Sequence, residues 1–336
     1  MGTVCNGTSL LWSCLFQLIL FIIKEDSVHF ITNRTVQKHG SNFSFDETSN
    51  ELSNSIRYCK LTSAKNFTEI LSGPMMQALK ENSTYKEILF YIHGFNNQPS
   101  TDIFPNARIL QEEFDSADLG TLVVPIIWPC DNDLGVVKDY WDDQKAAKTS
   151  GEILSRTLSK LLQWQQKNAK NPCLKRMHIL AHSMGNRVLM HCMDEWRHTS
   201  GNGEMPYLFN NIFMMAADVP NEVLERDQIG QAITMAARRV LCYYANDDLA
   251  MTASKVSNVK NRVFSRRLGH TGPESMAKVP DHVYALNCDR FNNNYDSKGH
   301  SYFLRDNQGH LSPALLHMME MIQRRTVALE KRNYTL

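Results

Sequence analysis

The sequence predicts an α/β fold, built on a mostly parallel, doubly wound sheet with helices on both faces. From Glu87 onward, apolar runs that suit buried strands alternate with amphipathic helical patterns, which is typical of such sheets. A strand–turn–helix pattern spans residues 176–196, with Ala-His-Ser-Met-Gly at its turn. The composition, 43% hydrophobic and 21% charged, is that of an ordinary globular protein. We expect a single α/β domain over residues 28–330.

Residues 1–24 are expected to form a separate hydrophobic segment, like a signal peptide or an anchor. Residues 10–23 are mostly apolar and uncharged, which is short for a membrane span and suits the core of a signal peptide. No basic residue precedes them and no Ala-x-Ala site follows. Five of the six Asn-x-Ser/Thr sequons lie before residue 85, which is compatible with export. Membrane association through residues 10–23, or export, is favoured over a cytoplasmic location, and cleavage of the segment stays open.

The first part of the domain carries weaker patterns. Residues 28–34 alternate well enough to predict an edge strand, and residues 56–62 predict a second strand. The polar residues 40–55 between them predict a loop. Residues 67–80 fit a short amphipathic helix, broken by a Gly-Pro dipeptide.

The later elements follow from apolar runs and helical spacing. The runs that predict strands are 87–95, 121–129, 177–180, 207–217, 239–245 and 282–288. The patterns that predict helices are 103–116, 140–167, 184–196, 221–237 and 311–331. The polar residues 255–279 are expected to form a mobile flap.

The turn at residues 181–185 has the small-x-Ser-x-Gly pattern of a nucleophile elbow. Such a turn is so sharp that the residues two before and two after the serine must be small. Ala181 and Gly185 meet this need. The pattern places Ser183 Oγ at the carboxyl edge of the sheet, above the positive end of the following helix. With a strand before it and a helix after it, the motif predicts a nucleophile rather than an ordinary loop serine.

The strand at residues 87–95 reaches His93-Gly94, where this architecture places half of an oxyanion hole. Gly94 lets the backbone approach a substrate oxygen, and the N–H of Phe95 is the candidate first donor. The N–H of Met184, directly after the serine, is the second. His93 and His182 flank the turn, and we expect them to shape the pocket or to pack.

A serine hydroxyl needs an adjacent base, and the base needs an orienting carboxylate. On this fold the chain order is serine, then acid, then histidine. Asp248 follows the strand at 239–245, and His300 ends the loop that leaves the last strand. The sequence therefore predicts Ser183, Asp248 and His300 as the catalytic residues.

Other residues remain open for two of these roles. Asp247 is adjacent to Asp248, and Asp218 ends the preceding strand, so either can replace it as the acid. His270 and His310 also lie in loops after the acid.

Charge and cysteine spacing give no support to several other classes of protein. The formal net charge is +1 without a long basic run, so there is no electrostatic case for nucleic acid. None of the eight cysteines forms a Cys-x-x-Cys pair, which leaves zinc and thioredoxin-like sites unsupported. His178 and His182 are four apart but straddle a strand and a turn, unlike a metal-binding helical pair. We expect no cofactor and no metal, and disulfide pairing stays open.

These residues together resemble the α/β-hydrolase superfamily, and more narrowly its branch described as an α/β-hydrolase domain of unknown function. The resemblance covers roughly residues 28–321. In that branch the acid stands two before an Ala-Leu pair, and Ala250-Met251 makes that residue Asp248. Ala181 replaces the first glycine of the elbow, and Ala245 stands where the branch often has serine. The matching motifs are Phe30-Ile-Thr-Asn-Arg34, Ile92-His-Gly-Phe-Asn-Asn97, Trp128-Pro129, residues 140–151, His182-Ser-Met-Gly-Asn-Arg187, Ala216-Ala-Asp-Val-Pro220, residues 244–251 and His300-Ser-Tyr-Phe303.

The sequence therefore predicts a serine hydrolase, esterase- or lipase-like, that cleaves carboxylic esters through an acyl-enzyme on Ser183. Its substrate would be a small-molecule or lipid ester. The alternative is a catalytically silent binding or scaffold protein on the same fold, since fold does not fix function. Another enzyme class that uses such a triad, a lyase or a perhydrolase, also stays open.

Overall fold

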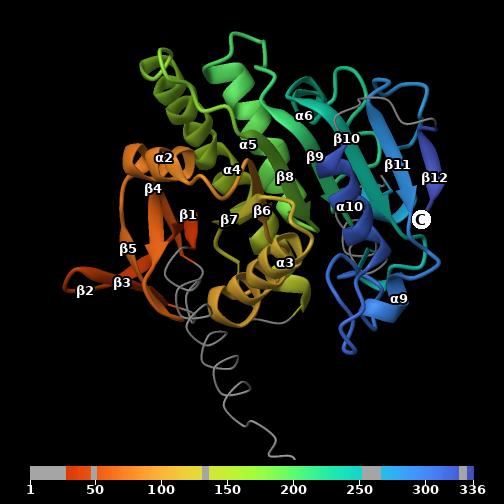
Figure 1. Ribbon diagram of the computed structural model, residues 1–336. Helices are drawn as coiled ribbons and strands as arrows, with labels where there is room; N and C mark the ends of the chain where they lie inside the picture. The colour runs from red at the N-terminus through yellow and green to blue at the C-terminus, as the bar shows by residue number, and fades with distance from the viewer. Residues whose placement is uncertain (1–27, 47–50, 131–135, 252–265, 325–330) are drawn as a thin grey trace, which may run out of the picture.

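A computed structural model describes residues 28–46, 51–130, 136–251, 266–324 and 331–336. In these residues, one sheet of twelve strands runs through the molecule, with helices on both faces (Figure 1). The α/β fold class predicted from the sequence is confirmed. The strands are β1 (His29–Arg34), β2 (Val36–His39), β3 (Asn42–Phe45), β4 (Leu52–Leu61), β5 (Asn66–Glu69), β6 (Glu87–Ile92), β7 (Thr121–Ile127), β8 (Arg176–His182), β9 (Phe209–Met215), β10 (Ala237–Tyr244), β11 (Val283–Asn287) and β12 (Asn333–Thr335).

The sheet has a parallel part and an antiparallel part. Its order is β12-β11-β10-β9-β8-β6-β7-β1-β4-β5-β3-β2, and neighbours are parallel from β12 through β1. From β1 through β2 they are antiparallel. Parallel neighbours need long crossovers, which the helices provide, whereas the first five strands are joined by short connections. The carboxyl ends of β6, β8, β9, β10 and β11 therefore meet at one edge of the sheet.

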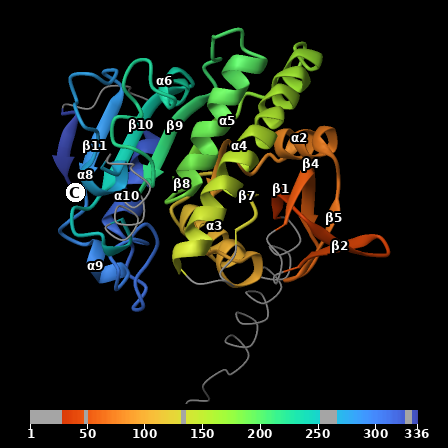
Figure 2. The same ribbon diagram turned by 180° about the vertical axis from the view of Figure 1, so that it is seen from behind.

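Helices cover the two faces in separate sets. The helices are α2 (Ser72–Glu81), α3 (Phe104–Ser116), α4 (Val136–Lys167), α5 (Gly185–Thr199), α6 (Gln231–Met235), α8 (Leu268–Thr271), α9 (Asn292–Tyr295) and α10 (Pro313–Gln323), with a π-helical turn, η1 (Pro99–Ile103), before α3. In Figure 1, α3 and α10 lie in front of the sheet, and Figure 2 shows α4 and α5 side by side on the opposite face. Alternate residues of each strand serve the two faces, so Ile88 and Ile92 pack toward α4 and α5, whereas Leu89 and Tyr91 pack toward α3 and α10.

The first strands differ from the sequence prediction. β1 is not an edge strand, because it lies between β7 and β4 and five of its six residues are buried. Part of the predicted loop at 40–55 forms β3 and the start of β4, and residues 66–69 form a strand instead of a helix. The Gly-Pro pair stands in the first turn of α2, where proline is tolerated because that turn has unpaired N–H groups anyway.

Two predicted helices are shorter than expected. Of residues 221–237, only Gln231–Met235 is helical, because the chain before it folds back and Gly230 N–H donates to Val223 O at 3.1 Å. A Cβ on Gly230 would lie 2.7 Å from that same oxygen. α10 ends at Gln323 because Arg324 is extended, with φ −64° and ψ 122°.

The predicted mobile flap and the N-terminal segment are only partly described. In the described part of 255–279, Leu268 N–H donates to Val219 O and Gly269 N–H donates to Ala217 O, both at 2.9 Å. These bonds tie α8 to the end of β9. Residues 255–265 and the hydrophobic segment 1–24 lie outside the described residues.

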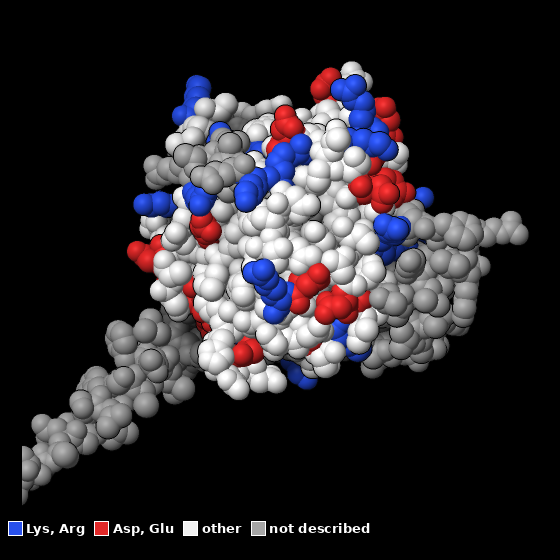
Figure 3. Space-filling model, turned by 90° about the vertical axis from the view of Figure 1, so that its right-hand side faces the viewer, with Lys and Arg blue, Asp and Glu red and all other residues white. Residues whose placement is uncertain are grey.

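Within the described ranges, no helix combines the length and the apolar character that crossing a membrane requires. The face at the β12 edge of the sheet carries Lys and Arg side chains interspersed with Asp and Glu (Figure 3). Charges of both signs on one face give it no field of a single sign. The six cysteines of the described residues, from Cys59 to Cys288, are all free thiols.

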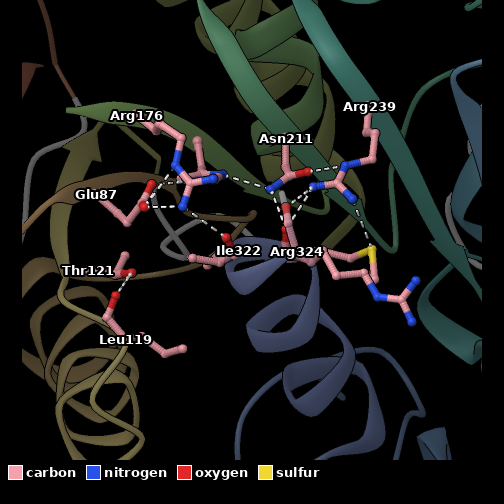
Figure 4. A network of polar contacts seen from close by, with 10 residues as sticks. Glu87, Leu119, Thr121, Arg176, Asn211, Arg239, Ile322 and Arg324 are labelled. Atoms are coloured by element: carbon pink, nitrogen blue, oxygen red, sulfur yellow. Dashed lines mark hydrogen bonds and ion pairs between the residues drawn. The ribbon is translucent and has the colours of Figure 1, made fainter. Parts of the chain in front are cut away.

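A row of polar side chains crosses the amino-terminal part of the central strands (Figure 4). Glu87 on β6 stands opposite Arg176 on β8, and Asn211 on β9 stands opposite His178 on β8 and Arg239 on β10. Glu87 Oε1 accepts from Arg176 Nε at 2.8 Å, and Glu87 Oε2 lies 3.1 Å from His178 Nε2. Asn211 Oδ1 accepts from Arg239 Nε at 2.8 Å, so its amide nitrogen faces His178 Nδ1, 2.9 Å away. We call these five residues the polar ladder.

The polar ladder holds the C-terminal end of α10. The last carbonyls of a helix have no donor within the helix. Met321 O accepts from Asn211 Nδ2 at 3.1 Å and from Arg239 Nη2 at 2.8 Å, and Arg239 Nη2 also donates to Arg324 O at 3.2 Å. Arg176 Nη2 donates to Ile322 O at 3.4 Å. The ladder therefore supplies donors that the helix itself lacks.

Candidate active site

Ser183 lies on the sharp turn between β8 and α5, in the left-handed region of backbone conformation, with φ 51°. Such a conformation costs a non-glycine residue about 1–3 kcal/mol. Main-chain hydrogen bonds hold it in place: Ser183 N–H donates to Met215 O at 2.9 Å, and Ser183 O accepts from Asn186 N–H and Asp218 N–H, both at 3.1 Å. The neighbouring strand β9 and the helix thus fix the position of the serine.

The two small residues around Ser183 differ in the space that their surroundings leave for a side chain. A Cβ on Gly185 would lie 2.5 Å from His93 O and 2.7 Å from Ile92 O, which are rigid main-chain atoms of the adjoining strand end. Glycine is therefore required at this position. Ala181 is fully buried and accommodates its methyl group, and its carbonyl accepts from Asn186 Nδ2 at 2.8 Å. The elbow therefore tolerates the replacement of its first glycine.

A chain of hydrogen bonds links the three residues that the sequence singled out. His300 Nε2 lies 2.8 Å from Ser183 Oγ, and His300 Nδ1 lies 2.7 Å from Asp248 Oδ2. Asp248 is completely buried, and its Oδ1 accepts from Met251 N–H at 2.9 Å. Because an ionised carboxylate only accepts hydrogen bonds, Nδ1 of His300 carries its proton. Nε2 is then free to accept the proton of Ser183 Oγ.

Nearby carboxylates change the pKa of His300. Burial disfavours the charged imidazolium, but Asp248, through its charge and its hydrogen bond, favours it, and Asp218 and Asp296 add to this effect. Together the three carboxylates raise the pKa of His300 above its usual value. The surroundings thus stabilise the cation that would form when the ring accepts a proton.

The other candidates for the acid are engaged elsewhere. Asp247 accepts from Asn292 Nδ2 at 2.7 Å and from Asn293 Nδ2 at 2.5 Å. Asp218 is buried between Arg267, whose Nε lies 3.3 Å from its Oδ1, and Arg187, whose Nε lies 3.5 Å from its Oδ2. Both carboxylates hold loops or helices together, and of the three candidates Asp248 is the one hydrogen-bonded to the ring of His300.

The other candidates for the base are placed on other segments. His310 Nδ1 pairs with Asp306 at 2.9 Å, and His310 is largely exposed. His270 stands in α8, the short helix tied to the end of β9. His300 is the histidine within hydrogen-bond distance of Ser183 Oγ.

The predicted oxyanion donors belong to two segments that adjoin Ser183. Met184 is the N-cap residue of α5, so its N–H belongs to the helix end where N–H groups lack intrahelical acceptors. Gly94 brings the second segment close, because a Cβ there would lie 3.0 Å from Ser183 Cβ and 2.8 Å from His182 Nδ1. Phe95 follows Gly94 on this segment. The segment that carries Phe95 thus lies next to Ser183, as the start of α5 does.

His93 and Trp128 fix the loop that carries Gly94. Their rings stack, with centroids 5.2 Å apart and planes 8° from parallel. Trp128 N–H donates to His93 Nε2 at 3.1 Å and Trp128 Nε1–H donates to His93 O at 2.9 Å. His93 Nδ1–H is then left to donate to Gly94 O at 2.9 Å. Burial lowers the pKa of His93 to about 3, so the ring stays neutral in this network.

Sequence reasoning missed the roles of Trp128 and of Asp296. Trp128 lies in one of the matching motifs, but the sequence assigned it no role. In the structure its indole N–H donates to His93 O, just after β6. Asp296 stood in a loop rich in Asn and Asp, where nothing distinguished it from its neighbours. In the structure its Oδ2 accepts from His300 N–H at 3.1 Å.

Among the described residues, no three His, Cys, Asp or Glu side chains are grouped so that they could hold a metal ion.

A mostly parallel sheet with helices on both faces, and a serine on a sharp strand–helix turn at its carboxyl edge, define the α/β hydrolases. The chain belongs to the family described as alpha/beta hydrolase of unknown function (DUF900), whose model matches residues 72–309. The resemblance inferred from the sequence motifs is confirmed. The matched region contains Ser183, Asp248 and His300. No curated protein matches the chain.

Proposed function

We propose that this α/β hydrolase cleaves carboxylic esters, with Ser183 as nucleophile, His300 as general base and acid, and Asp248 as the orienting carboxylate. The observation that carries the proposal is the unbroken hydrogen-bond chain from Asp248 Oδ2 through His300 to Ser183 Oγ, with steps of 2.7 Å and 2.8 Å. A nucleophile, a base within reach and a third group that orients the base are the signature of an activated serine.

The reaction would proceed in two halves. As Ser183 Oγ attacks the ester carbonyl, its proton passes to His300 Nε2, and the oxyanion accepts from the N–H groups of Met184 and Phe95. His300 then gives the proton to the departing alkoxide, which leaves an acyl-enzyme on Ser183. A water molecule repeats the sequence, with His300 again as base, and releases the acid.

Esters are favoured over amides because an alkoxide leaves with less assistance than an amine does. Lipid and small-molecule esters both fit the proposal. The backbone of Ser183, held at φ 51°, also supports an enzyme over a silent binding protein, since strained residues cluster at active sites.

The test is labelling with a fluorophosphonate probe, followed by peptide mapping. Wild-type protein should carry the adduct on Ser183, Ser183→Ala should carry none, and His300→Ala should react much more slowly. Ser116→Ala, which removes an exposed hydroxyl on α3, should be labelled like the wild type. A folded wild type that takes no adduct on Ser183 would contradict the hydrolase and favour the binding or scaffold protein.

A further inference from the structure

We propose that Asp296 is a positioning residue of this site, whose carboxylate fixes the main chain of His300 and so the orientation of its ring. The proposal rests on the proposed function, because the ring matters only if it transfers protons. Asp296 makes no contact with the serine and would act through His300.

The carboxylate of Asp296 lies at the centre of the loop that carries His300. Its Oδ2 accepts from His300 N–H at 3.1 Å and from Ser301 N–H at 3.0 Å. Its Oδ1 accepts from Lys298 N–H at 3.2 Å, and its carbonyl accepts from Gly299 N–H at 2.8 Å. Four N–H groups of this loop therefore converge on one residue.

The opposite side of the His300 peptide is held as well. His182 Nε2 lies 3.3 Å from His300 O, and the His182 ring packs between the rings of His300 and Phe303, at centroid distances of 4.9 Å and 4.7 Å. Burial, helped by the charge of His300, lowers the pKa of His182 to about 3. The neutral ring donates from Nε2, so both the N–H and the C=O of His300 are engaged.

The same loop is tied to the loop of the acid. Leu249 N–H, directly after Asp248, donates to Lys298 O at 3.0 Å. Asp296 therefore holds a segment that is also connected to Asp248, and releasing the carboxylate would loosen the base relative to both of its partners. Displacing a reacting group by about 1 Å can cost about 100-fold in rate.

Asp296 also adds a negative charge beside His300. Desolvation opposes this charge, but the N–H donors of Ser301, Lys298 and His300 lower the pKa of Asp296 below its usual value, so the group is ionised at neutral pH. It joins Asp248 and Asp218 in raising the pKa of His300. Removing the charge should therefore move the titration of His300 to lower pH.

The chain supplies a matched control in the next turn. Asp306 stands four residues before His310, as Asp296 stands before His300. Asp306 Oδ1 accepts from Gln308 N–H at 2.9 Å and from His310 N–H at 2.8 Å. Asp306→Asn thus changes a turn of the same kind and leaves the hydrogen bonds of Asp296 in place.

The experiment compares wild type, Asp296→Asn, Asp296→Ala and Asp306→Asn in p-nitrophenyl acetate hydrolysis across pH, with thermal melts of each. Asparagine keeps one acceptor oxygen but removes the charge, so Asp296→Asn should keep its fold. Its kcat should fall about 10- to 100-fold with little change in KM, and its acid limb should move to lower pH. Asp296→Ala should lose more kcat than Asp296→Asn, and Asp306→Asn should have the kcat and acid limb of the wild type.

The outcomes separate the two proposals. A wild type without hydrolysis or adduct contradicts the proposed function itself. If the wild type is active, any of three results contradicts the role of Asp296. Asp296→Asn keeps the wild-type kcat and acid limb, or Asp306→Asn loses as much kcat as Asp296→Asn does. The third is that kcat falls only in proportion to the amount of folded protein.

Discussion

Asp248 and His300 stand 52 positions apart in the chain, yet Asp248 Oδ2 lies 2.7 Å from His300 Nδ1. Their meeting follows from the sheet, because β10 and β11 are parallel neighbours and the loops that leave both strands do so at the same edge. The Leu249 N–H bond to Lys298 O joins the two loops directly. The geometry of the pair is thus a product of strand order rather than of nearness in sequence.

Replacing Asp248 by asparagine should reduce kcat about 10³- to 10⁴-fold, because an amide can no longer hold the Nδ1 proton and stabilise the imidazolium. Asp247→Asn is the matched control, since its carboxylate binds Asn292 and Asn293 instead. Hydrolysis of p-nitrophenyl acetate measures both variants. A large loss in Asp247→Asn with a normal Asp248→Asn would reassign the acid.

The pH profile of kcat/KM should rise with pH through the pKa of His300, because only the neutral ring accepts the Ser183 proton. The midpoint should lie above 6.5, the usual value, since the surrounding carboxylates raise this pKa. The same shift affects the free energy of unfolding: His300 stabilises the folded protein fully below pH 6.5, and this contribution is lost as the pH rises through the folded-state pKa. A midpoint below 6.5 would falsify this account of His300.

Gly185→Ala should destabilise the fold by about 3 kcal/mol, at the upper end of what overpacking costs. The new Cβ would stand 2.5 Å from His93 O, and main-chain atoms cannot yield as a side chain does. Gly73→Ala is the control, because nothing lies within 4 Å of its Cβ. In the helix α2 it should stabilise by up to about 1 kcal/mol. Urea unfolding distinguishes the two variants, and equal effects would be at odds with the close approach at Gly185.

Asn211→Ala should cost about 3 kcal/mol, since it removes the acceptor of Arg239 Nε and a donor to Met321 O within a buried network. The neighbouring Asn210 points to the other face of β9, and its Nδ2 is buried without a hydrogen-bond partner. Because this amide nitrogen has no hydrogen bond to lose, Asn210→Ala should not lower the free energy of unfolding. Chemical denaturation measures the free energy of unfolding of both variants. An equal decrease in both would contradict a stabilising role of the polar ladder.

The sequence predicted the elements whose causes are local or repetitive. The elbow was predictable because a sharp turn restricts the residues at its own positions, Ala181 and Gly185. The parallel strands were predictable because burial on both faces makes them continuous apolar runs. Asp248 and His300 followed from where those strands end. The structure joins Ser183, Asp248 and His300 by hydrogen bonds.

The elements that the sequence did not predict depend on distant partners. β3 and β5 are four residues each and half-exposed, so pairing rather than composition makes them strands. Residues 221–237 have apolar residues at helical spacing, but the Gly230 bond to Val223 O turns most of the segment back on itself. Asp296 accepts hydrogen bonds from main-chain N–H groups. Because every residue except proline carries such a group, the sequence does not show which residues Asp296 binds.

The hydrogen bonds between the polar ladder and α10 can form only late in the synthesis of the chain. Asn211 and Arg239 are synthesised more than eighty residues before Met321, whose carbonyl they bind. Until residue 324 has left the ribosome, the strands that bear these side chains lack the carbonyls of the final helix. The release of α10, in addition to the pairing of the central strands, is thus needed to complete the polar ladder in the nascent chain.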